Sequence, residues 1–132
     1  MNNNDIRILI VDDEEFIRIS LVAFLEDEGF EIYSANSAEQ AIELVDQHNF
    51  DLGIIDMKLP GIDGNTLILE LHKKNPSMKF IIHTGSVNYQ VPRKLISIGI
   101  TNQNILLKPV KNLDVILNKI HTVLNKFSSD DN

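Results

Sequence analysis

The sequence predicts an α/β fold: a doubly wound sheet of five parallel strands, with five helices in alternation with them. Short apolar runs alternate with longer amphipathic segments along the whole chain. The run at 52–55 is apolar throughout, as expected for a central strand covered on both faces. Right-handed crossovers restrict the layout further, and the strand order 2-1-3-4-5 is the common one for this number of strands.

The first strand and helix have clear limits in the sequence. We predict a strand at 6–11 and a helix at about 15–28. Glu14 and Glu15 suit the positive N-terminal end of this helix. Gly29 is a plausible helix stop, and a second strand follows at 30–35.

The second helix begins at a capping motif. Ser37 and Gln40 have the spacing of a capping box, in which two side chains satisfy free N–H groups of the first turn. The third strand is the apolar run at 52–55. The segment 57–64 is rich in glycine and proline and is predicted to be a loop. The apolar face of the second helix consists of Ala38, Ala41, Ile42 and Val45.

The third helix should run from this loop to Lys74, where Asn75-Pro76 ends it. A fourth strand is expected at 80–83. Pro92 is compatible only with the first turn of a helix, which places the fourth helix at about 91–98.

A polar connection at 99–104 leads to the last strand–helix unit. The strand is predicted at 105–107. The final helix has apolar residues at spacings of three and four, which place them on one face. They are Leu113, Ile116, Leu117, Ile120, Leu124 and Phe127. The polar stretch 128–132 is expected to be a frayed tail or the start of a linker.

The 132 residues fit a single domain, 1–132, with its folded core at about 6–127. No apolar run approaches the ~20 residues that span a bilayer, so we expect no membrane association. The net charge of −7 without a basic cluster argues against direct nucleic-acid binding. The sequence has no cysteine and no visible signal peptide, which agrees with a cytoplasmic protein.

Chemically active residues follow four of the predicted strands. Asp12 and Asp13 follow the first, Asp56 the third, Thr84 the fourth and Lys108 the fifth. The carboxyl ends of strands are where open parallel sheets bind ligands, so these side chains should converge. Three carboxylates in one place favour a hard divalent cation such as Mg²⁺. With a lysine and a threonine beside them, the residues suggest metal-assisted phosphoryl transfer to or from Asp56.

Other polar and aromatic residues are better explained by structure. Asp63, between two glycines, has the character of a turn or helix cap and is left out of the site. His83 is expected to be a packed strand residue, and the remaining histidines show no metal-binding spacing. Four phenylalanines are expected in the core: Phe16, Phe24, Phe30 and Phe127.

These motifs resemble the receiver domain of two-component response regulators, a flavodoxin-like fold. The resemblance covers about 6–127, nearly the whole chain. Each motif alone is weak, but four in the right order, each at a strand end, are a strong signal. The matching segments are Val11-Asp12-Asp13-Glu14, the run from Asp56 to Gly64 (DMKLPGIDG), Thr84-Gly85 and Lys108-Pro109.

The resemblance implies a role for each site residue. Asp56 would accept a phosphoryl group from a histidine kinase or a phosphotransfer protein. Asp13, Asp56 and the backbone carbonyl of Lys58 would bind Mg²⁺, and Asp12 would hold metal-bound water. Lys108 would pair with the phosphoryl oxygens. Thr84 would turn toward them and move its loop, changing a surface for a downstream effector or a second copy. The Lys108-Pro109 bond would be cis.

The chain departs from the usual pattern of the family in two respects. Receivers usually have Tyr or Phe three residues before the lysine, and Ile105 stands there. The connection from Gly99 to Lys108 is about two residues longer than usual. Lys58 and Ser86 occupy the variable positions that tune dephosphorylation in this family.

Three alternatives use a similar fold. A flavodoxin is disfavoured because acidic residues after the first strand would repel flavin phosphate. A haloacid-dehalogenase-type phosphatase needs an aspartate two residues after its nucleophile, where Lys58 stands. The serious rival is a receiver-like module that binds a partner without phosphorylation. Against it, every residue of the phosphorylation site is present. The chain is therefore expected to be a signalling phosphoacceptor rather than an enzyme acting on a separate substrate.

Overall fold

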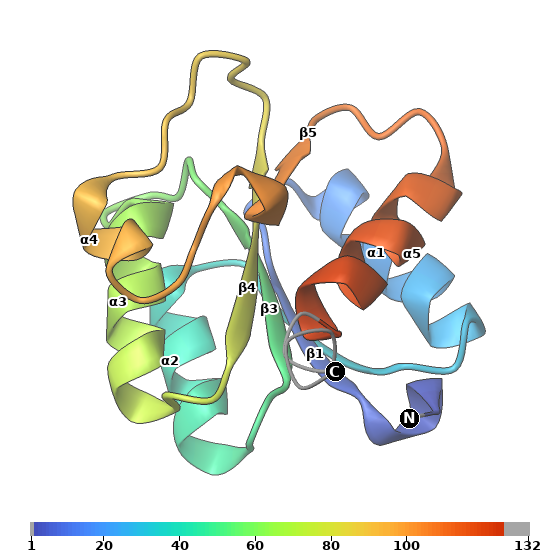
Figure 1. Ribbon diagram of the computed structural model, residues 1–132. Helices are drawn as coiled ribbons and strands as arrows, with labels where there is room; N and C mark the ends of the chain where they lie inside the picture. The colour runs from blue at the N-terminus through green and yellow to red at the C-terminus, as the bar shows by residue number, and fades with distance from the viewer. Residues whose placement is uncertain (1, 126–132) are drawn as a thin grey trace.

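A computed structural model describes residues 2–125 of the chain. It contains five strands alternating with five α-helices, and two short 3₁₀ helices (Figure 1). The strands are β1 (Arg7–Val11), β2 (Glu31–Ala35), β3 (Leu52–Asp56), β4 (Lys79–Thr84) and β5 (Ile105–Leu107). The α-helices are α1 (Glu15–Asp27), α2 (Ala38–Gln47), α3 (Gly64–Lys74), α4 (Arg93–Ile96) and α5 (Leu113–Leu124). The 3₁₀ helices are η1 (Asn3–Asp5) and η2 (Asn102–Asn104).

All strand pairs are parallel, and the order is β2-β1-β3-β4-β5. The fold class and the strand order predicted from the sequence are confirmed. Every residue of β3 is buried, as its apolar sequence requires. The tail at 128–132 and the predicted core residue Phe127 lie outside the described residues.

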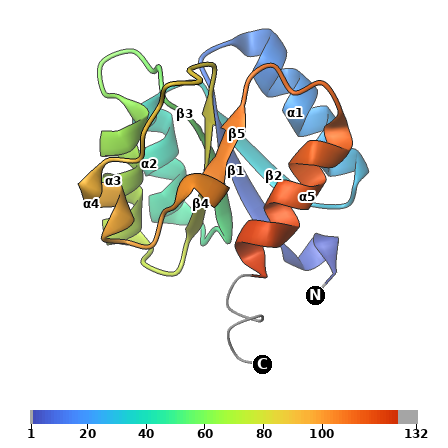
Figure 2. The same cartoon turned by 45° about the horizontal axis from the view of Figure 1, so that its top comes forward.

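Helices cover both faces of the sheet (Figures 1 and 2). On one face, α1 and α5 bury a cluster that includes Ile8, Ile54 and Ile116. On the other face, α2, α3 and α4 bury a second cluster around Leu9 and Ile55. Successive strand residues therefore contribute to opposite clusters, as the alternation of side chains along a strand dictates.

Local sequence signals set several helix ends as predicted. Gly29 ends α1 with a φ of +99°, a left-handed backbone that glycine adopts without strain. Ser37 caps α2 by accepting a hydrogen bond from the N–H of Gln40. The Gln40 side chain accepts from Asn36 rather than from Ser37, so the reciprocal bond lies one residue earlier than in a standard capping box. Asp63 caps α3, consistent with its exclusion from the site.

The fourth helix is shorter than predicted. α4 spans Arg93–Ile96, whereas the sequence suggested 91–98. Pro92 takes the N-cap position with an extended ψ of 153°, so the helix begins after it. Gly99 follows with a φ of +98°, and little more than one turn fits between these two residues.

One predicted core residue is exposed. Phe16 is 84% exposed, although it was expected in the core. It lies in the first turn of α1, and the buried residues of this helix are Leu21 and Leu25. On α5, Leu113 at the start of the predicted apolar face is 45% exposed, and Val123, which was not assigned to that face, is buried.

The long connection before β5 is ordered by η2, which the sequence pattern did not predict. Asn104 is buried, and its side-chain amide donates to the carbonyl of Phe80 in β4 at 2.7 Å. Its side-chain oxygen accepts from the backbone N–H of Thr101 at 2.9 Å. These bonds attach the start of β5 to β4, and β5 itself has the predicted bounds.

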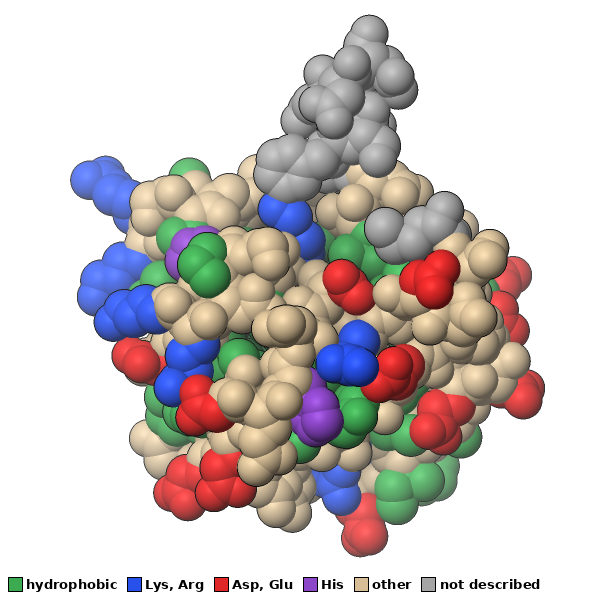
Figure 3. Space-filling view, turned by 90° about the horizontal axis from the view of Figure 1, so that it is seen from below, with side chains coloured by type: hydrophobic (Ala, Val, Ile, Leu, Met, Phe, Trp, Pro, Cys, Tyr) green, Lys and Arg blue, Asp and Glu red, His purple; other side chains and the backbone are tan. Residues whose placement is uncertain are grey.

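Figure 3 shows the end of the molecule opposite the carboxyl ends of the strands. Lys and Arg side chains gather on the side of α3 and α4, and most Asp and Glu side chains lie on the other side. Basic residues in the last turn of α3, including Lys73 and Lys74, interact favourably with the negative end of its dipole.

Within residues 2–125, no helix combines the length and the apolar character needed to cross a membrane.

Gly64 permits the close approach of α3 to the end of β3. A Cβ at this position would lie 2.5 Å from the carbonyl oxygen of Asp56 and 2.8 Å from the Cα of Met57. We expect Gly64→Ala to lower the free energy of unfolding by roughly 2 kcal/mol, because backbone must shift to make room. Chemical denaturation measures this loss. Gly85→Ala is the control, since a Cβ there would meet no atom within 4 Å; equal stability of both variants would contradict the prediction.

Candidate functional site

Strand register brings the predicted site residues to one edge of the sheet. Asp56, the last residue of β3, pairs with His83 of β4, and Thr84 pairs with Leu107 of β5. Lys108 follows directly, and its backbone N–H donates to the carbonyl of Thr84 at 2.8 Å. The end of β5 is thereby fixed to the end of β4, which positions the lysine side chain over the neighbouring strand ends.

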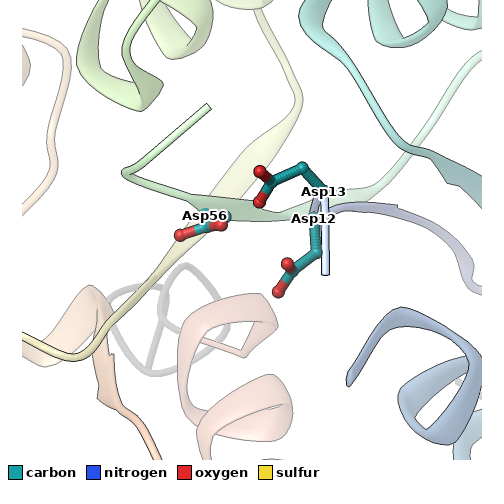
Figure 4. Close-up of side chains that lie close together, drawn as sticks. All are labelled: Asp12, Asp13 and Asp56. Carbon is teal, nitrogen blue, oxygen red and sulfur yellow. The ribbon is translucent and has the colours of Figure 1, made fainter. Parts of the chain in front are cut away.

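The three predicted carboxylates converge. Carboxylate oxygens of Asp12, Asp13 and Asp56 all lie within 4.8 Å of one another, and Figure 4 shows them gathered at the ends of their strands. Asp12 and Asp56 are buried, whereas Asp13 is exposed. An all-oxygen set of this kind, open on one side to solvent, suits a hard cation such as Mg²⁺. The residues present therefore fit the metal that the sequence implies.

Backbone and side-chain donors hold these acids in place. One oxygen of Asp12 accepts from the N–H of Glu14 at 2.9 Å, and its carbonyl accepts from the guanidinium of Arg18 at the same distance. The carboxylate of Asp56 accepts from the N–H of Lys58 at 3.2 Å. The loops after β1 and β3 are thus tied to the carboxylates that they carry.

Burial changes the acidity of Asp56. Its pKa rises from 3.8 to about 6, chiefly because burial disfavours the charged form. The N–H of Lys58 opposes this rise, the negative charge of Asp12 adds to it, and Lys108 opposes it. Asp56 is thus a carboxylate whose charge is poorly compensated, which is the electrostatic setting that a divalent cation would relieve.

Lys108 is the cation that lies between the buried acids. Its Nζ is 3.1 Å from an oxygen of Asp12 and 3.4 Å from oxygens of both Asp56 and Glu14. Burial alone would lower the pKa of Lys108, but the hydrogen bond and charge of Asp12, with those of the other acids, raise it overall. The side chain therefore remains an ammonium group.

Thr84 completes a cavity of about 320 Å³ at the strand ends. Its hydroxyl oxygen is buried and accepts from the N–H of Ser86 at 3.1 Å. The cavity lies above Asp56 and is lined by Asp13, Glu14, Asp56, Lys58, Thr84, Gly85 and Lys108. All predicted site residues except Asp12 line it, and Asp12 lies behind it in contact with Lys108.

Two other predictions concern the surroundings of this cavity. His83 is 3% exposed, as expected for a packed strand residue, and burial lowers its pKa to about 4, so the ring is neutral near pH 7. The Lys108-Pro109 peptide bond is cis, as the resemblance implied.

The sequence pattern does not reveal two contacts that bear on the site. The first is the ion pair of Glu14 with Lys108. The second is a hydrogen bond of 2.6 Å from the Tyr89 hydroxyl to the side-chain oxygen of Asn65. The tyrosine in the loop after β4 was the sequence signal of the second contact. It connects the loop after β4 to the first turn of α3.

Comparison with known proteins agrees with this geometry. The family model of the response regulator receiver domain matches residues 8–121, so the chain belongs to the receiver domain family. It is 30% identical over 120 residues to a cyclic di-GMP phosphodiesterase of Thermotoga maritima, covering 90% of this chain and 31% of that protein. It is 34% identical over 84 residues to the two-component response regulator PhoP of Pseudomonas aeruginosa, covering 64% of this chain and 37% of PhoP. The chain thus spans about a third of each of these relatives.

Solved receiver structures share the fold. A CheY-like receiver domain protein from Methanospirillum hungatei is 32% identical, with a TM-score of 0.82, over 95% of this chain and 98% of that one. The response regulator TrrA of Thermotoga maritima, solved in complex with Mg²⁺ and BeF, is 33% identical, with a TM-score of 0.73, over 89% of this chain and 97% of that one.

The raised pKa of Asp56 predicts a pH-dependent stability. Between pH 3.8 and about pH 6, Asp56 is protonated in the folded state but ionised in the unfolded state, so stability falls as pH rises through this range. Above it, Asp56→Asn should be more stable than the wild type by roughly 2–3 kcal/mol. Denaturation at several pH values measures this. Mg²⁺ should stabilise the wild type more than the variant; identical pH profiles for the two proteins would contradict the assignment.

Proposed function

We propose that this chain is a phosphoacceptor signalling domain that receives a phosphoryl group on Asp56 from a histidine kinase or a phosphotransfer protein. The observation that carries the proposal is a single cavity in which a buried carboxylate faces two further acids, a lysine and a threonine. Membership of the receiver domain family supports a histidine kinase and a downstream effector as partners, and a cytoplasmic location.

The transfer needs few groups. An oxygen of Asp56 forms a bond to phosphorus while the bond from phosphorus to the donor's imidazole nitrogen breaks. The electron pair of that bond stays on the nitrogen, which is then protonated. The ammonium of Lys108 lies 3.4 Å from Asp56 and can stabilise charge on the transferred oxygens. Protein catalysis here is largely positioning of fixed charges.

Mg²⁺ would be held by Asp13, Asp56 and the carbonyl of Lys58, with Asp12 beside them. When bound, the ion supplies positive charge that offsets the repulsion between an anionic nucleophile and an anionic phosphoryl group. Asp12 and Asp13 supply the negative charge that makes this edge attractive to a divalent cation, and Asp56 supplies the nucleophile.

The loop after β4 is proposed to carry the signal outward. The hydroxyl of Thr84 accepts from Ser86, whose carbonyl accepts from the N–H of Tyr89 at 3.3 Å. Tyr89 in turn donates to Asn65 of α3. If Thr84 turns to donate to a phosphoryl oxygen, its hydrogen bond with Ser86 is lost. The chain of hydrogen bonds from Thr84 through Ser86 to Tyr89 is then broken at its first step. Receivers usually have an aromatic residue at the position of Ile105, and Ile105 cannot form such a polar contact. We therefore assign to Tyr89 the role that this aromatic residue would have in transmitting the change.

The rival function is a receiver-like module that binds a partner without phosphorylation. No contact in the described structure favours it. The convergence of all the phosphorylation residues favours the phosphoacceptor. The two functions differ in one direct measurement, which is covalent modification of the chain.

Asp56 is expected to be the sole phosphoacceptor. Incubation with acetyl phosphate and Mg²⁺ should add the mass of one phosphoryl group to the wild type and none to Asp56→Asn, since the amide is not a nucleophile. Intact mass spectrometry measures the product. Asp46→Asn is the matched control, because Asp46 is a surface carboxylate paired with Lys74 and should leave the mass gain unchanged.

A mass gain in Asp56→Asn would move the phosphoacceptor to another residue. No gain in the wild type would support the binding-module function. Excess chelator and the variant Asp13→Asn should each reduce phosphorylation strongly, and full phosphorylation under chelation would refute the metal requirement.

Phosphorylation should reorder the loop from Thr84 to Val91 and the start of α3. Beryllofluoride, a phosphoryl mimic, is expected to change amide-exchange protection in both segments. In Tyr89→Phe the change should persist beside Asp56 but weaken at the start of α3, because the bond to Asn65 is missing. Tyr33→Phe, remote from the loop, is the control. Unaltered exchange at α3 in the wild type would exclude this relay.

A further inference from the structure

Lys108 has one partner that the proposed chemistry does not use. Of its three acidic neighbours, Asp12 and Asp56 belong to the buried cluster, but Glu14 does not. The Glu14 side chain is 59% exposed and lies at the N-cap of α1, at the rim of the cavity. It also borders a second, largely apolar cavity of about 470 Å³ between α1 and α5. Glu14 is therefore within reach of whatever approaches Asp56.

The two hydrogen bonds of Lys108 go to acids other than Asp56. Its ammonium donates to Asp12 at 3.1 Å and to Glu14 at 3.4 Å, and it forms an ion pair with Asp56 at 3.4 Å. To serve a phosphoryl group on Asp56, the ammonium must redirect a donor. The bond to the exposed Glu14 is the easier one to give up, because an exposed ion pair is weak.

The charge of Glu14 also opposes an anionic phosphodonor. The charges of Asp13 and Asp56 would be offset by the cation that they would hold, and Asp12 is buried against Lys108. Glu14 belongs to no part of the proposed metal site, and its exposed negative charge, offset only in part by Lys108, faces an approaching donor. At the rim, in a medium close to water, this repulsion is modest but extends over the cavity mouth.

We propose that Glu14 is a specificity-determining residue for the phosphodonor. It slows phosphorylation by small anionic donors, both by repelling them and by keeping Lys108 turned toward the rim. A donor surface that places a basic side chain over Glu14 removes both effects. This inference rests on the proposed function, and it concerns which donor Asp56 accepts rather than whether it accepts one.

The test compares the rate of Asp56 phosphorylation by acetyl phosphate, a dianion, and phosphoramidate, a less negatively charged donor, at saturating Mg²⁺. Glu14→Gln should raise the rate with acetyl phosphate by about fivefold. The gain with phosphoramidate should be smaller, and added salt should shrink the difference between variant and wild type. Glu15→Gln is the matched control, an adjacent exposed acid that does not line the cavity; its rates should equal those of the wild type.

A purely structural role for Glu14 would not depend on donor charge or on salt. Equal rates for Glu14→Gln and the wild type, an equal gain with both donors, or the same gain in Glu15→Gln would each overturn the proposal. A slower reaction in Glu14→Gln would also overturn it. These outcomes differ from failure of the proposed function, in which the wild type itself would gain no mass with either donor.

Discussion

The ion pairs of Lys108 with Asp12 and Asp56 join three strand ends, and much of the structure serves to make them possible. The buried carboxylates of Asp12 and Asp56 lie close enough to repel each other, and a buried charge without a partner lowers the stability of the fold. Lys108 can reach both only because β4 and β5 are paired up to Thr84 and Leu107. The order of the strands, the length of β5 and the contact of Lys108 with the Thr84 carbonyl are therefore all conditions for one partly buried cation to lie between two buried anions.

The fold was predictable because its signals are local. A fully apolar β3, glycine at the end of α1 and the cap at Ser37 act within a few residues of the element they define. Phe16 shows where this fails. Apolar residues occupy several faces of α1, so the periodicity alone does not decide which of them packs on the sheet. For α4, Pro92 excludes a longer helix through its backbone conformation, which the composition of the segment does not reveal.

The candidate site was predictable for a different reason. Parallel strands bring their carboxyl ends together, so polar residues at those ends meet even when they are far apart in sequence. Asp56 and Lys108 were placed in this way. The contacts of Glu14 and Tyr89 depend instead on rotamers and on the path of a loop. Tyr89 and its partner Asn65 are 24 residues apart with no shared strand edge to indicate their proximity.

The side chain of Asn104 has a consequence for the long connection before β5. By bonding to the Phe80 carbonyl and to Thr101, it gives β5 a fixed starting point on β4. Ile100, just before Thr101, is buried in the core, so the connection is held at both of its ends. The fold thereby fixes both the path of the connection and the spacing from Asn104 to Lys108 that the charge cluster requires. This explains how the connection can be long without displacing the lysine from its acids.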